Sequence, residues 1–173
     1  AASPSEEAHA EPLVVRRLRS NAGRRFGSLM HEFLATIDWV PLGDEAAVRE
    51  IINSAPDVLR ERLRTLFQSP HGWKVFERPD ESVDLWREKP YILRRQDTVA
   101  NGIIDRAHLL IDASGAPVKA TIYDYKTDAL DPARSANEQL LDRYGTQLER
   151  YCEAVCLLSG LPADSVSAEL IPV

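Results

Sequence analysis

Two aspartates, Asp105 and Asp124, stand at equal distances from the dipeptide Ser114-Gly115. If the flanking segments form a β-hairpin that turns at this dipeptide, paired residue numbers sum to 229 (105 plus 124), and the two aspartates face each other. Opposite side chains on one face of an antiparallel pair have Cβ atoms about 5 Å apart, and like charges placed there repel. A divalent cation bound through carboxylate oxygens would offset that repulsion. The spacing therefore predicts a metal site.

Lys126 follows Asp124 by two residues, so the alternation of a strand returns it to the same face. A lysine beside two carboxylates can position an attacking water and stabilise negative charge that develops during the reaction. The plainer alternative is a surface salt bridge to Asp124 or Asp128, which would contribute at most about 1 kcal/mol. Together, the two acids and the lysine predict a hydrolytic site.

Glu88 is a candidate third acid beside Asp105 and Asp124. A turn at residues 96 and 97 would pair residues whose numbers sum to 193, which sets Glu88 opposite Asp105. Asn101-Gly102 is a competing turn signal. A turn there would leave little strand before Asp105, so the earlier turn is favoured. Glu88 could still be an ordinary exposed strand residue, or one that orients the site without binding metal.

The spacing of apolar residues predicts the elements that carry these side chains. Helices are expected over about residues 22–38, 44–54, 57–68 and 136–159. Strands are expected over about residues 83–94, 98–111, 117–126 and 166–172. This order favours an α/β fold with a mixed sheet: an N-terminal helical part, an antiparallel three-strand meander, a crossover helix and a final strand.

A chain of 173 residues can form one well-packed core. We expect a disordered or linker segment over residues 1–20 and a single domain over 21–173, mainly helical over 21–80, with the catalytic core over 81–173. The start at Ala1 indicates a piece cut from a longer polypeptide. No apolar run approaches the roughly 20 residues of a membrane span, and no signal peptide is evident, so a cytoplasmic protein without membrane contact is expected.

Charge and cysteine content narrow the choice of ligands. The net charge of −6 argues weakly against nucleic-acid binding. Yet five arginines, Arg24 and Arg25 among them, occur between Glu11 and Glu32 without an acidic residue. They could contact a nucleic-acid backbone or form a solvated helix face. The two cysteines, at 152 and 156, are too few to hold a zinc ion or an iron–sulfur cluster and are interpreted as structural thiols.

Five short motifs occur in order along these elements. They are Gly27-x-x-x-His31, Glu88-x-Pro90, Gly102-x-x-Asp105-Arg106, Asp124-Tyr125-Lys126-Thr127 and Gln147-x-x-x-Tyr151. From about residue 24 onward the chain thereby resembles nuclease domains of the PD-(D/E)XK superfamily, most closely the RecB/AddA-like branch at the C-terminal end of bacterial helicase-nucleases. The resemblance implies a restriction-endonuclease-like core.

The resemblance also implies residue roles. Magnesium, for which manganese could substitute, would be bound by His31, Asp105, Asp124 and the backbone carbonyl of Tyr125. The implied catalytic residues are Lys126, Asp124, Asp105 and Glu88. Gln147 and Tyr151 would contact the DNA backbone or the lysine, and Arg24 and Arg25 would contact DNA. Simple packing is the plainer alternative for His31 and Tyr151.

The implied function is a metal-dependent DNA exonuclease module of a helicase-nuclease in double-strand-break repair. Because the chain has no P-loop motif, helicase domains of the parent polypeptide would deliver single-stranded ends, and a second helicase-nuclease subunit is a further expected partner. Iron–sulfur relatives carry four cysteines, so a cluster-free type is expected. Two alternatives stay open: a noncatalytic DNA-binding or docking module that keeps the nuclease fold, and a stand-alone phage or repair exonuclease.

Overall fold

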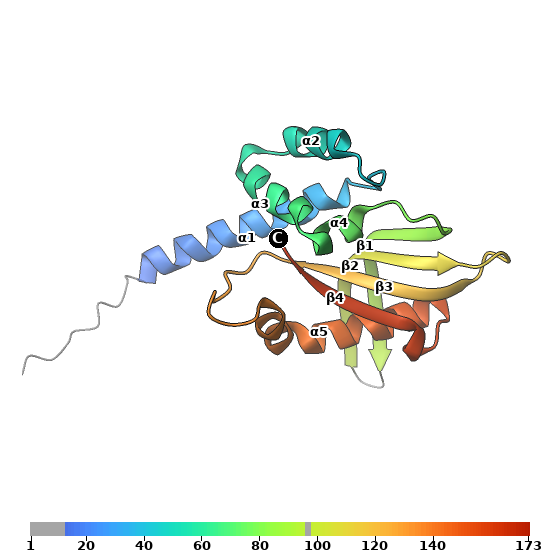
Figure 1. Cartoon of the computed structure of the whole chain (residues 1–173). Helices are drawn as coiled ribbons and strands as arrows, with labels where there is room; N and C mark the ends of the chain where they lie inside the picture. The colour runs from blue at the N-terminus through green and yellow to red at the C-terminus, as the bar shows by residue number, and fades with distance from the viewer. Residues whose placement is uncertain (1–12, 96–97) are drawn as a thin grey trace, which may run out of the picture.

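A single mixed sheet forms the centre of the protein (Figure 1). The structure, a computed structural model, describes residues 13–95 and 98–173. The strands lie side by side in the order β1 (Val83–Arg95), β2 (Thr98–Ile111), β3 (Pro117–Lys126) and β4 (Val166–Pro172). The first three strands are antiparallel, and β4 runs parallel to β3. The predicted three-strand meander and parallel final strand are confirmed.

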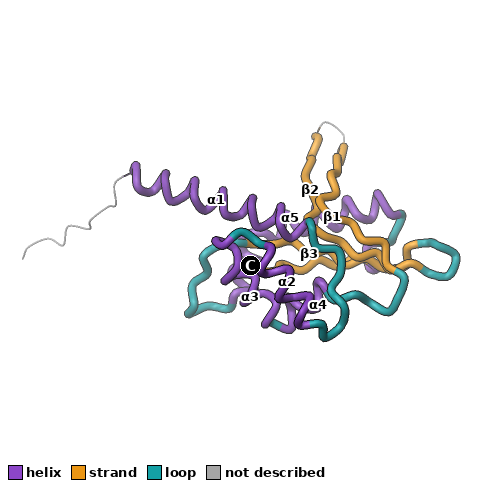
Figure 2. The backbone as a smooth tube through the Cα atoms, turned by 90° about the horizontal axis from the view of Figure 1, so that it is seen from above, coloured by secondary structure: helices purple, strands orange, loops and turns teal. Residues whose placement is uncertain are grey.

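Helices cover both faces of this sheet (Figures 1 and 2). The N-terminal helices α1 (Leu13–Ala35), α2 (Glu45–Ser54), α3 (Asp57–Gln68) and α4 (Pro70–Phe76) pack around one apolar core. The long helix α5 (Ala136–Ser159) packs on the other face and, with the 3-10 turn η1 (Ala163–Ser165), connects β3 to β4. None of the helices in the described ranges is long and apolar enough to span a membrane.

Two N-terminal features differ from the sequence predictions. Helix α1 begins at Leu13, so residues 13–20 are helical rather than linker, while residues 1–12 lie outside the described ranges. Helix α4 was not predicted, because a proline just after an apolar helical pattern, such as Pro70, is typical of a helix end. Proline also suits the first position of a helix, and the Ser69 hydroxyl caps α4 by accepting a hydrogen bond from Gly72 N at 2.9 Å.

The pairing of β1 with β2 follows the predicted register. Paired residue numbers sum to 193 from Val83↔Leu110 to Arg95↔Thr98. Residues 96 and 97, where the turn was predicted, lie outside the described residues. The competing turn at Asn101-Gly102 is wrong, because both residues belong to β2.

The pairing of β2 with β3 also follows its predicted register, but the turn does not. Pairs sum to 229 from Arg106↔Tyr123 to Leu110↔Lys119, whereas Ile111↔Pro117 sums to 228. The difference leaves Val118 as the extra residue of a β-bulge. The connection is therefore a five-residue loop, 112–116, and the two-residue turn at residues 114 and 115 is wrong. The bulge restores the register that brings the two aspartates together.

Arg106 connects the sheet to the chain that follows α1. Its side chain is 1 % exposed, and its guanidinium donates hydrogen bonds to the carbonyls of Ile37 and Asp38. The rings of Trp39 and Phe76 flank the guanidinium at 4.9 Å and 4.8 Å. Because α1 carries a candidate ligand, this buried arginine contributes to the position of the helix relative to the sheet.

His108 should make the stability of the fold depend on pH. Burial, and secondarily the charge of Arg106, lower the pKa of His108 to about 3. Its Nε2 accepts a hydrogen bond from Arg106 Nε at 2.9 Å, which requires neutral imidazole. An unfolded histidine has a pKa of about 6.5, so below that pH the unfolded chain binds a proton that the folded chain rejects. Acidification from pH 6.5 to 4.5 should therefore cost about 2 kcal/mol of stability through this residue.

The His108→Gln variant isolates this contribution, because glutamine keeps an acceptor for Arg106 and does not titrate. Urea denaturation at pH 7 and pH 4.5 measures the loss of stability in each protein. The wild type should lose about 2 kcal/mol more than the variant. Equal losses in the two proteins would show that His108 does not remain neutral in the fold.

Candidate active site

The candidate site lies where β2 and β3 separate. The ladder between them ends at Arg106↔Tyr123, so Asp105 and Asp124 are the next residues in register. Both carboxylates are buried, and Asp105 Oδ2 accepts a hydrogen bond from the backbone N of Tyr125 at 2.9 Å. This bond holds the Asp105 carboxylate in the gap between the two strands.

His31 reaches the same gap from α1. Its Nδ1 lies 3.2 Å from Asp105 Oδ1, and its ring contacts the edge of the Tyr125 ring. Burial alone would lower the pKa of His31, but the hydrogen bond and negative charge of Asp105 outweigh it, and the charges of Asp124 and Glu88 add to the increase. The imidazole therefore lies in a strongly negative environment.

Glu88 joins this group from β1 through an unusual backbone conformation. Its φ of 45° is in the left-handed region, and among the described residues no other non-glycine residue has a positive φ. Such conformations are sparsely populated and are found most often at functional sites. One ligand atom each from His31, Glu88 and Asp105 lies within 4.8 Å of the others. Burial, followed by the charge of Asp105, raises the pKa of Glu88, so a cation would relieve the repulsion.

Asp124 is oriented differently from the other two acids and is not a member of that three-residue group. Its Oδ2 lies 2.6 Å from Lys126 Nζ, but the contact lacks hydrogen-bond geometry, and this buried oxygen has no hydrogen-bond partner among the described residues. Burial raises the pKa of Asp124, and Asp105 adds to the increase while Lys126 opposes it. A buried carboxylate oxygen without a hydrogen-bond partner beside two further acids and an imidazole suits a divalent cation.

Lys126 is held by side chains of α5. Its Nζ donates a hydrogen bond to Gln147 Oε1 at 3.0 Å, and Gln147 Nε2 donates to the Tyr151 hydroxyl at 2.7 Å. The ammonium also lies 4.1 Å from the centre of the Tyr144 ring. Tyr144 in turn donates a hydrogen bond to the Asp128 carboxylate at 2.9 Å. The lysine therefore has a defined position and remains next to Asp124.

A family model described as the PD-(D/E)XK nuclease superfamily matches residues 9–173. The chain belongs to this superfamily. Membership implies nuclease activity, and the mixed sheet with its helices agrees with the restriction-endonuclease-like fold expected from the motifs. The nuclease has no match among curated proteins.

The predicted DNA contacts of the nuclease fall into two groups. Arg24 and Arg25 are exposed on α1, near the helical turn that leads to His31. Gln147 instead contacts both Lys126 and Tyr151, and Tyr151 is buried beside Tyr91. A direct DNA contact by any of these four residues stays a prediction.

From the sequence, Tyr144 could belong to the core or extend the surface beside the candidate site, and a core position was favoured. It lies three residues before Gln147 on α5, so helix geometry places both side chains on the same side. That spacing was the available signal. An aromatic residue at such a position more often belongs to the core, and only the contact with Lys126 distinguishes the two cases.

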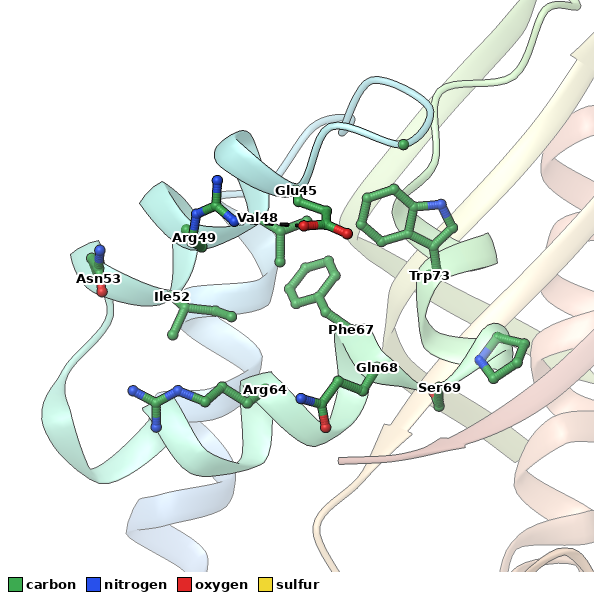
Figure 3. Close-up of a pocket in the computed structure, with 12 residues that line it drawn as sticks. Glu45, Val48, Arg49, Ile52, Asn53, Arg64, Phe67, Gln68, Ser69 and Trp73 are labelled. Carbon is green, nitrogen blue, oxygen red and sulfur yellow. Dashed lines mark ion pairs between the residues drawn. The ribbon is translucent and has the colours of Figure 1, made fainter.

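The site opens to solvent through a cavity of about 390 Å³ lined by residues of α1 and β1. The lining residues are Gly27, Ser28, His31, Glu32 and Glu88. A larger cavity of about 820 Å³ lies between α2, α3 and α4 (Figure 3). None of the candidate site residues lines that larger cavity. The candidate site is therefore accessible through the smaller opening, not through the larger cavity.

Gly27 lets α1 approach the end of β3 closely. A Cβ at this position would lie 3.0 Å from the Thr127 hydroxyl oxygen. We expect Gly27→Ala to push α1 away by a few tenths of an ångström, and His31 lies one helical turn later on the same face. Divalent-cation affinity, measured by calorimetry, should therefore fall several-fold while the far-UV circular dichroism stays unchanged.

Gly23→Ala is the matched control, because Gly23 lies one turn earlier on α1 and a Cβ there would meet nothing within 4 Å. Alanine should stabilise an exposed helix by about 0.5–1 kcal/mol relative to glycine and leave cation affinity unchanged. Equal cation affinities in the two variants would show that the close approach at Gly27 does not position His31.

Proposed function

We propose that this nuclease is a deoxyribonuclease that hydrolyses phosphodiester bonds with Mg²⁺, for which Mn²⁺ substitutes. The observation that carries the proposal is the group of His31, Glu88 and Asp105 within 4.8 Å, next to the ion pair of Lys126 with Asp124. Hard oxygen ligands with a single imidazole suit these cations.

Five groups would hold the cation. They are the side chains of His31, Glu88, Asp105 and Asp124 and the backbone carbonyl of Tyr125. A bound divalent cation neutralises charge on the phosphoryl group and lowers the pKa of water. Glu88 was predicted as a catalytic acid, with an orienting residue or an ordinary exposed strand residue as alternatives. Its place within 4.8 Å of His31 and Asp105 supports the role of a ligand.

Lys126 acts on the water and on the charge of the transition state. Its ammonium can hold the attacking water next to the scissile phosphate and donate a hydrogen bond to the oxygen on which negative charge grows. The hydrogen bond to Gln147 and the contact with the Tyr144 ring restrict its motion, so the ammonium is positioned before the substrate binds. Prior positioning is the largest contribution a protein makes to this kind of catalysis.

The cellular role we infer is that of an exonuclease module of a helicase-nuclease in double-strand-break repair. The motifs that resemble the RecB/AddA-like branch support this role. Helicase domains of the parent polypeptide, and a second subunit of such a complex, would then supply single-stranded ends. Arg24 and Arg25, exposed on α1, could contact the incoming strand.

A cleavage assay tests the proposed activity. The protein is incubated with end-labelled single-stranded and double-stranded DNA in Mg²⁺, in Mn²⁺ and in EDTA. We expect cleavage with either cation, faster on the single strand, and none in EDTA. A protein that binds DNA but cuts neither substrate with any divalent cation would instead be a noncatalytic DNA-binding module.

A further inference from the structure

The strands β1 and β2 continue beyond the active site as a projecting hairpin (Figure 2). We call residues 89–95 and 98–104 the hairpin arm. One face of the arm packs against the rest of the protein: Tyr91, Leu93 and Ile104 are buried in the core beside α5, and the rings of Tyr91 and Tyr151 lie 5.8 Å apart. We call the opposite face the outer face. It consists of Pro90, Ile92, Arg94, Val99, Asn101 and Ile103, all of them exposed.

The outer face exposes large apolar side chains to water. Ile92 is 76 % exposed, Val99 65 % and Ile103 48 %. Single exposed apolar residues are common, but several on one strand pair form a surface typical of interaction sites. The same two strands bury apolar side chains on their other face, so the exposed ones are not needed for the fold of the arm.

The arm is also positively charged in an acidic protein. Residues 89–94 include two cationic side chains and no acidic one, residues 98–104 have no charge, and the net charge of the chain is −6. Arg94 lies on the outer face, directly opposite Val99. A ligand that combines apolar surface with negative charge would complement this face.

The outer face is continuous with the active site. Its first pair, Pro90↔Ile103, lies two residues beyond Glu88 on β1 and two residues before Asp105 on β2. From residue 103 to residue 99 the strand extends roughly 13 Å away from the site, at about 3.3 Å per residue. A DNA strand whose scissile phosphate lies at the site must leave it in some direction, and this surface borders the site directly.

We propose that the outer face of the hairpin arm binds the unpaired DNA segment next to the scissile phosphate. The side chains of Ile92, Val99 and Ile103 contact the bases, and Arg94 contacts a phosphate. An unpaired strand can turn its base faces toward the protein, whereas a duplex presents its charged backbone outward and offers little to aliphatic side chains. The inference rests on the proposed nuclease activity and names the substrate form that the site prefers.

The double variant Ile92→Thr/Val99→Thr tests the apolar contact. Threonine is β-branched, so the strands should persist while the outer face becomes polar. The control is Leu42→Thr/Val118→Thr, which changes two exposed apolar residues outside the arm; Leu42 is 76 % exposed, as is Ile92. Each protein is assayed on a single-stranded oligonucleotide and on bis(p-nitrophenyl) phosphate, a diester too small to reach the arm.

We expect the arm variant to raise the KM for the oligonucleotide about fivefold or more. Its rate on the small diester should stay at the wild-type value, and the control variant should match the wild type on both substrates. An unchanged KM for the oligonucleotide, with activity intact, would overturn the inference and leave the arm as a surface for another protein. A wild type that cleaves neither the oligonucleotide nor the small diester would instead contradict the proposed nuclease function.

The salt dependence of binding tests the charged contact. Single-stranded DNA binding is measured by fluorescence anisotropy in EDTA, where cleavage is suppressed, at several salt concentrations. Arg94→Ala should reduce the slope of log K against log salt by about 0.7, as expected for one lost phosphate contact on a single strand. Arg64→Ala, an exposed arginine on α3, should leave the slope unchanged. Equal slopes for wild type and Arg94→Ala would exclude Arg94 from the DNA path.

Discussion

Replacement of Lys126 by methionine is expected to lower the rate of single-stranded DNA cleavage by about 1000-fold or more. Methionine keeps most of the length and packing of the side chain but removes the ammonium that lies 2.6 Å from Asp124 and 3.0 Å from Gln147. The transition state then loses its positioned hydrogen-bond donor. The residues proposed to bind the cation are not altered, so calorimetry should still detect cation binding in the variant.

Lys119→Met is the matched control for this experiment. Lys119 lies on the same strand, β3, but is exposed near its start, far along the strand from the site. We expect cleavage by this variant to stay within a factor of two of the wild type. Cleavage at the wild-type rate by Lys126→Met would remove the lysine from the proposed mechanism.

Replacement of Arg106 by methionine should cost about 3 kcal/mol of folding stability. The guanidinium is buried and donates hydrogen bonds to the carbonyls of Ile37 and Asp38 and to His108. Without it the buried Ile37 carbonyl loses its partner at a cost of about 1–3 kcal/mol, and the partly buried Asp38 carbonyl and His108 ring lose theirs at a smaller cost. Urea denaturation measures the change in the free energy of unfolding.

Arg87 provides a control directly across the ladder from Arg106. Arg87 also contacts the C-terminal end of α1 and the residues just after it, through the Ala35 carbonyl and the Asp38 carboxylate. Unlike Arg106, it is exposed. We expect Arg87→Met to cost at most about 1 kcal/mol, because solvent can replace an exposed ion pair. Equal losses for the two arginine variants would show that burial does not decide the contribution of Arg106.

Much of the fold follows from local sequence patterns. Strand alternation in β1, β2 and β3 predicted their bounds, and the assumed turns predicted both registers, because a slip of one residue would expose every buried side chain. The bulge at Val118 could not be predicted in this way. It adds a residue to β3 without altering the apolar pattern. The pair sum is 228 next to the loop, and the extra residue raises it to the predicted 229 beyond the bulge. The prediction of the register was thus right although the turn was wrong.

The candidate site was predictable only in part. Register and alternation indicate which of the site residues share a face, and they brought Asp105, Asp124 and Glu88 into one neighbourhood. They do not determine the side-chain rotamer, which sets where a carboxylate points. The left-handed backbone of Glu88 and the orientation of Asp124 toward Lys126 therefore appear only in the structure. A core position was favoured for Tyr144, because helix periodicity does not distinguish an aromatic residue of the core from one that contacts a partly buried lysine.

Anomalous diffraction from a crystal of the protein soaked in Mn²⁺ tests the central claim most directly. In the proposed mechanism a cation is bound by His31, Glu88 and Asp105, whose ligand atoms already lie within 4.8 Å of one another. We expect an anomalous peak at about 2.0–2.6 Å from an atom of each residue. A manganese peak elsewhere, or none between these three residues under conditions in which the protein cuts DNA, would contradict it.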